Sequence, residues 1–141
     1  MSLPKNEMVR IIVEHKNNIE EITSEIKQKL QNVKPTSRPL DQETTGFVQL
    51  RVDSVVKELS ILGSFCGRSE KEYVNRVSDI IGRITSVGYI DYSVAIIIRF
   101  WCTMVNSLMI DLDKTPFKFF GSFKIDLKSL ETQVKTLYQR K

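Results

Sequence analysis

Few residues in this sequence have side chains that could do acid–base, nucleophilic or metal chemistry, and they are scattered. The single histidine, His15, falls on the apolar stripe of a predicted helix, where a metal or acid–base site would need further groups within reach. Cys66 and Cys102 are far apart in the sequence, and neither has a CxxC partner. Glu20 and Glu21 are adjacent on a helix and point to different sides, so they cannot share one proton. These residue types and spacings predict neither a catalytic site nor a metal site.

The glycines form none of the motifs that bind phosphate or present a nucleophile. Among the six glycines there is no GxxxxGK(S/T) phosphate loop, no GxGxxG dinucleotide motif and no GxSxG nucleophile elbow. We therefore expect a protein that is not an enzyme, that uses no cofactor and that takes no small-molecule substrate.

Composition indicates an ordinary globular domain. The chain has 141 residues, of which 41% are hydrophobic and 27% are charged, as is typical of one domain with its own core. The first ten residues lack the apolar run of a signal peptide, and two cysteines do not make a disulfide framework, so we expect an intracellular, cytoplasmic location. The longest apolar stretch, residues 94–110, has Arg99 near its middle. A charge at the bilayer centre costs about 3 kcal/mol, so this stretch is predicted to be a core helix without a membrane span.

Apolar residues spaced three or four apart predict a single all-α domain over residues 1–141. A long amphipathic helix is expected over residues 4–33, ending before Pro35, and a very apolar helix over residues 92–112. The residues expected to cap or stop the later helices are Asp41 and Gly63 for the second, Ser69 with Glu72 and Gly88 for the third, Asp91 for the fourth and Asp126 for the last. The predicted fold is an antiparallel bundle of about five helices around a buried central helix, 92–112.

The first helix carries more apolar surface than a small bundle is expected to cover. At 1.5 Å per residue it would extend about 45 Å, whereas the other helices would have about 20 residues each. Part of its apolar seam is therefore expected to pair with another chain; the alternative, in which loops or the second helix cover the seam, stays open. The seam consists of Ile12, His15, Ile19, Ile22 and Ile26. The main functional hypothesis is a non-enzymatic protein–protein interaction or assembly protein that self-associates, as a homo-oligomer, through its first helix.

A second hypothesis concerns the basic aromatic loop and last helix, residues 113–141. Residues 114–141 carry seven Lys or Arg against two Asp or Glu, a net charge of +5. Aromatic rings stack on unpaired bases and lysines neutralise phosphates, so the segment suggests a small RNA-binding, coat-like or RNA-sequestering protein. The nucleic-acid-binding residues would be Phe117, Lys118, Phe119, Phe120, Lys124, Lys128, Lys135 and Arg140. The same aromatic rings could instead pack against the core at one end of the bundle.

A third hypothesis comes from a short resemblance. Residues 81–84 (IGRI), before the very apolar helix, resemble the Gly-Arg element before the core helix of Bcl-2-like proteins. Residues 108–112 (LMIDL) are similar to a helix end in poxvirus-type members of that family. The Asn-Trp pair that the family places before the glycine is replaced by Ile80 and Ile81. The resemblance implies a virus-type modulator of host death or inflammatory signalling, with a groove that accepts amphipathic helices.

Overall fold

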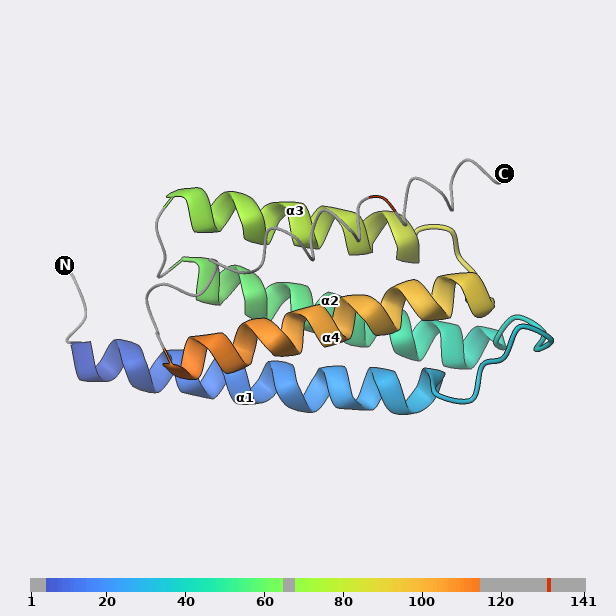
Figure 1. Ribbon diagram of the computed structural model, residues 1–141, viewed down its shortest axis with the longest axis horizontal. Helices are drawn as coiled ribbons and strands as arrows, with labels where there is room; N and C mark the ends of the chain where they lie inside the picture. Colours follow the sequence, from blue (N-terminus) through green and yellow to red (C-terminus); the bar gives the residue numbers. More distant parts are fainter. Residues whose placement is uncertain (1–4, 65–67, 115–131, 133–141) are drawn as a thin grey trace.

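The computed structural model describes residues 5–64, 68–114 and 132 as a helical bundle (Figure 1). Its helices are α1 (Lys5–Leu30), α2 (Gln42–Gly63), α3 (Arg68–Thr85) and α4 (Tyr92–Lys114). Successive helices run in opposite directions, and no strand occurs within the described ranges, so the all-α prediction is confirmed. The last predicted helix, which begins at Asp126, lies outside the described residues apart from Thr132.

Each helix packs against two others. The contacts join α1 with α2, α2 with α3, α3 with α4, and α4 with α1. The central position predicted for the helix over 92–112 is not confirmed, since within the described part of the chain α4 packs only against α1 and α3. One side of α4 is exposed, at Ile96, Arg99, Thr103 and Ser107. The polar side chains Arg99, Thr103 and Ser107 of this helix therefore reach solvent.

The hydrophobic core lies between the four helices. Trp101 of α4 is fully buried, and its indole N–H donates to the backbone carbonyl of Val77 in α3 at 3.2 Å. This hydrogen bond satisfies the polar atom of the largest core side chain. In the described residues, no helix is long and apolar enough to cross a bilayer.

The helix starts follow the local sequence rules. The Asp41 carboxylate accepts the Thr44 amide proton at 2.6 Å, and the Asp91 carboxylate accepts that of Val94 at 3.0 Å, so both predicted N-caps are confirmed. α3 begins at Arg68, one residue before the predicted cap Ser69, whose side chain lies outside those described.

The two glycines expected to end helices behave differently. Gly88 follows α3 with φ of +82°, the left-handed conformation predicted for a helix stop. Gly63 was expected to adopt the same conformation, and that prediction is wrong: Gly63 is the last residue of α2, and Ser64 after it is right-handed. Gly63 instead lies against α3, where an added Cβ would be 3.3 Å from a methyl group of Val74, a tight contact. The lack of a side chain at Gly63 thus suits the close packing of α2 on α3.

Candidate functional site

The apolar seam of α1 lies inside the folded chain. Ile12, Ile19 and Ile26 are buried in the core, and Ile22 is partly buried against it. α2 covers one side of this stripe and α4 covers the other. Most of the seam is therefore buried within this chain, and its pairing with a second chain stays a prediction.

His15, the polar member of the seam, contacts α2. Its Nδ1 hydrogen-bonds to a carboxylate oxygen of Glu58, and both side chains are half-buried. Within the described ranges, no group of three or more His, Cys, Asp or Glu side chains could hold a metal ion. The His15–Glu58 pair therefore acts here as a polar contact between α1 and α2.

A second polar contact links α1 to α4. The Thr23 hydroxyl lies 2.8 Å from the side-chain carbonyl oxygen of Asn106 and 2.8 Å from the backbone carbonyl of Ile19. A hydroxyl has one proton, so it donates to one of these oxygens only. Both contacts are satisfied when Thr23 donates to Ile19 and the Asn106 amide is turned so that its N–H donates to Thr23. Thr23 is fully buried, so this contact fixes α1 against α4 directly beside an open groove.

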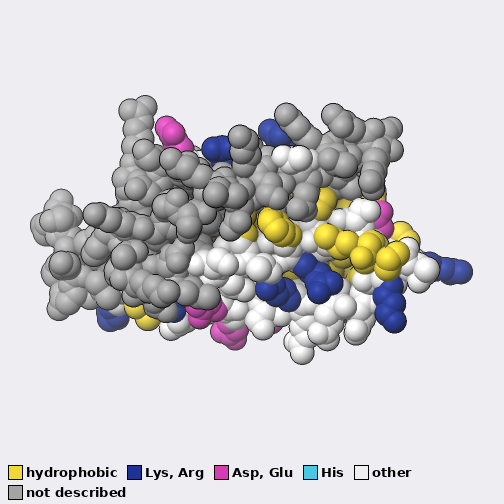
Figure 2. Space-filling view, in the orientation of Figure 1, with side chains coloured by type: hydrophobic (Ala, Val, Ile, Leu, Met, Phe, Trp, Pro, Cys, Tyr) yellow, Lys and Arg dark blue, Asp and Glu magenta, His cyan; other side chains and the backbone are white. Residues whose placement is uncertain are grey.

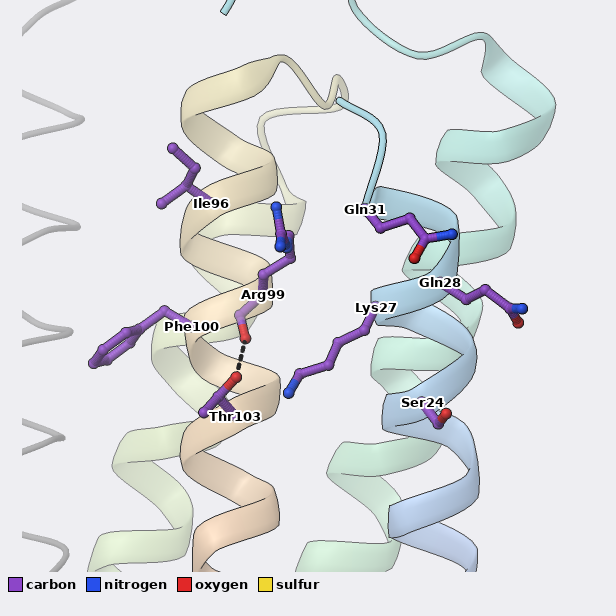
Figure 3. A pocket seen from close by; sticks show the side chains of 8 residues that line it. All are labelled: Ser24, Lys27, Gln28, Gln31, Ile96, Arg99, Phe100 and Thr103. Carbon is purple, nitrogen blue, oxygen red and sulfur yellow. Dashed lines mark hydrogen bonds between the residues drawn. The ribbon is translucent and has the colours of Figure 1, made fainter. Parts of the chain in front are cut away.

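The groove runs between the C-terminal half of α1 and the N-terminal half of α4 and has a volume of about 570 Å³ (Figure 3). α1 contributes Ser24, Lys27 and Gln28 to its lining, and Gln31 comes from the turn that follows α1. α4 contributes Ile96, Arg99, Phe100 and Thr103. These are the side chains left on the flanks of the two helices once their apolar stripes have entered the core.

The lining side chains are sorted by type across the groove. Lys27 extends from α1 toward α4 near Thr103, and Arg99 extends from α4 along the groove toward the start of that helix (Figure 3). Ile96 and Phe100 project from the flank of α4 that faces away from α1, and Gln28 projects away from α4. Figure 2 shows hydrophobic side chains next to Lys and Arg side chains on this face of the molecule. The groove thus has one cation from each side, an apolar flank on α4 and carboxamides on the α1 side.

Among the described residues that line the groove, the titratable groups are the two cations, and none is Asp, Glu, His or Cys. The Thr103 hydroxyl donates to the backbone carbonyl of Arg99 at 3.1 Å. Cys102 precedes the groove residue Thr103 in the sequence, and its side chain is buried in the core. Burial raises the pKa of the Cys102 thiol to about 12, against the smaller, opposite effect of the Lys27 charge. A thiol in this state is not a nucleophile at neutral pH.

The basic aromatic residues predicted to bind nucleic acid are outside the described residues. The groove residues Lys27, Arg99 and Thr103 form no motif in the sequence, because Lys27 lies on α1 and the other two lie on α4. Only the packing of α1 against α4 brings these side chains to one groove, and no local pattern in either helix encodes that packing.

Comparisons of the chain with protein-family models, with curated proteins and with solved structures give no match. The Bcl-2-like hypothesis and the RNA-binding hypothesis both stay predictions.

Proposed function

We propose that this chain is a non-enzymatic protein-interaction protein whose partner site is the groove between α1 and α4. The observation that carries the proposal is the lining itself. It combines cations, carboxamides and apolar side chains, which recognise a partner, and the lining residues that the structure describes include no carboxylate, imidazole or thiol for acid–base or nucleophilic chemistry.

The proposal keeps the partner site on the first helix but moves it to another face. Ile12, Ile19 and Ile26 are engaged within the chain, whereas Ser24, Gln28 and Gln31 are exposed. The described lining spans residues 24–31 and 96–103, eight residues on each side, which corresponds to about 10 Å or two helical turns. An open site of this length suits a short peptide segment of a partner protein.

A peptide-display selection tests the proposal. A library of random peptides, about 16 residues long, is selected on the full chain and then retested on two variants. Ile96→Glu adds a charge at a groove residue that is 38% exposed, and Leu50→Glu makes the same kind of change on α2, outside the groove, at a residue that is 69% exposed. Both side chains are already in contact with water, so both variants are expected to fold.

The groove proposal predicts peptides whose binding falls about tenfold or more with Ile96→Glu and is unchanged with Leu50→Glu; such a loss corresponds to about 1.4 kcal/mol. Circular dichroism of both variants checks that the fold is intact. If no peptide is enriched, or if every enriched peptide binds both variants equally, the groove is not the partner site and the proposal fails.

A further inference from the structure

We infer that the segment bound in this groove is an acidic amphipathic helix of a partner protein. This inference rests on the proposed function and adds the chemistry of the partner. It is carried by the charge and the order of the side chains across the groove.

The first argument is the state of the two cations. Within the described part of the chain, no ion pair or cation–π contact involves Lys27 or Arg99. Other cations are engaged: Arg51 of α2 pairs with Glu25 at 3.1 Å and lies over the ring of Phe47. A bound carboxylate would gain the attraction of Lys27 and Arg99 without breaking an ion pair of either within the described residues.

The second argument is the apolar flank. Ile96 and Phe100 are four residues apart on α4 and therefore share one face of the helix. Arg99 and Thr103 form the adjacent stripe, toward α1. A partner helix with an apolar stripe next to an acidic stripe would place its apolar side chains on the first face and its carboxylates over the cations. An amphipathic helix with Asp or Glu bordering its apolar face has this arrangement.

The third argument concerns which segments do not fit. Residues 114–141 carry a net charge of +5, so their composition is not that of an acidic segment. A nucleic acid would need its phosphates neutralised by several cations, and the described lining of the groove offers two. The observations therefore favour an acidic polypeptide.

Charge-reversal variants of the full chain test the inference with the peptides selected above. Lys27→Glu combined with Arg99→Glu reverses the groove charge. Lys57→Glu combined with Lys71→Glu changes the net charge by the same amount at exposed residues outside the groove. Fluorescence anisotropy is measured at low and at high salt for each peptide, and for versions in which its Glu and Asp are replaced by Gln and Asn.

We expect the groove-dependent peptides to be acidic and helical when bound, and to lose about tenfold in affinity when their acids are neutralised. The groove double variant should lose binding by a larger factor, whereas the control double variant should keep it within about twofold. Affinity should fall as salt rises, because the pairing involves partly exposed charges.

Three results would overturn the inference. Groove-dependent peptides that are neutral or basic would leave the proposed function intact and refute the acidic partner. A random single-stranded oligonucleotide that displaces the peptides and requires Lys27 and Arg99 would assign the groove to nucleic acid. A dimer in light scattering that Ile96→Glu converts to monomer would make a second copy the occupant. Failure to select any groove-dependent peptide refutes the proposed function itself.

Discussion

Single polar residues inside this bundle are tied to particular neighbours on other helices. Thr23 meets Asn106 between α1 and α4, and His15 meets Glu58 between α1 and α2. A misaligned pair of helices would cost Asn106, His15 and Glu58 these partners, about 1–3 kcal/mol for a polar group that stays buried. The Thr23 hydroxyl, by contrast, would keep its bond to the carbonyl of Ile19 in its own helix. The polar pairs therefore favour one alignment of α1 with α2 and α4. Apolar packing alone would distinguish this alignment from others less strongly.

Cys102 gives a prediction at the same scale. Its side chain is fully buried, and burial raises the pKa of its thiol from 9.0 to about 12. The thiolate is the reactive form, so a Cys66→Ser variant, which keeps Cys102 as its one thiol, should label with Ellman's reagent only after unfolding. Between about pH 7 and pH 9, labelling of the urea-unfolded chain should accelerate as the thiol ionises, while labelling of the folded chain stays at baseline. Rapid labelling of the folded chain would show that α4 separates readily from its neighbours.

At the scale of helices, the sequence predicted what local chemistry determines. Asp41 and Asp91 cap helices because a carboxylate there accepts an amide proton three residues later, whatever the rest of the fold does. Gly63 was misassigned because its role depends on Val74, a residue of another helix. The groove was missed for the same reason, since Lys27 and Arg99 become neighbours only when α1 packs on α4.

Two glycines near the end of α3 provide a matched test of these local rules. Gly82 lies within the helix, and an added Cβ would meet nothing within 4 Å, so Gly82→Ala should stabilise the fold by about 0.5–1 kcal/mol. Gly88 has φ of +82° and equally open space, so Gly88→Ala should destabilise it by about 1 kcal/mol or more through backbone strain alone. Urea unfolding of both variants measures the two changes. If the free energy of unfolding changed in the same direction in both variants, α3 would not end as described.

At the scale of the whole molecule, helix lengths explain why the α1 seam is covered. The sequence predicted a first helix of 30 residues beside helices of about 20 residues. On that prediction, the shorter helices could not cover the whole apolar seam of the first. The structure has 26 residues in α1, 22 in α2 and 23 in α4. At 1.5 Å per residue the three helices differ in length by about 6 Å, or roughly one turn. The bundle can therefore bury the seam without a second chain.

Substitution of the seam separates an intramolecular core from an interface between chains. Ile19 is fully buried, and Asp at this position would place a carboxylate among apolar side chains without a partner. Because a domain of this size is stable by only roughly 5–15 kcal/mol, Ile19→Asp combined with Ile22→Asp should abolish the cooperative unfolding transition and most of the helical circular dichroism. Leu50→Asp, the same chemical change at an exposed position on α2, should leave both intact. A seam variant that stays helical but elutes with a smaller mass than the unmodified protein in light scattering would instead show that the seam joins two chains.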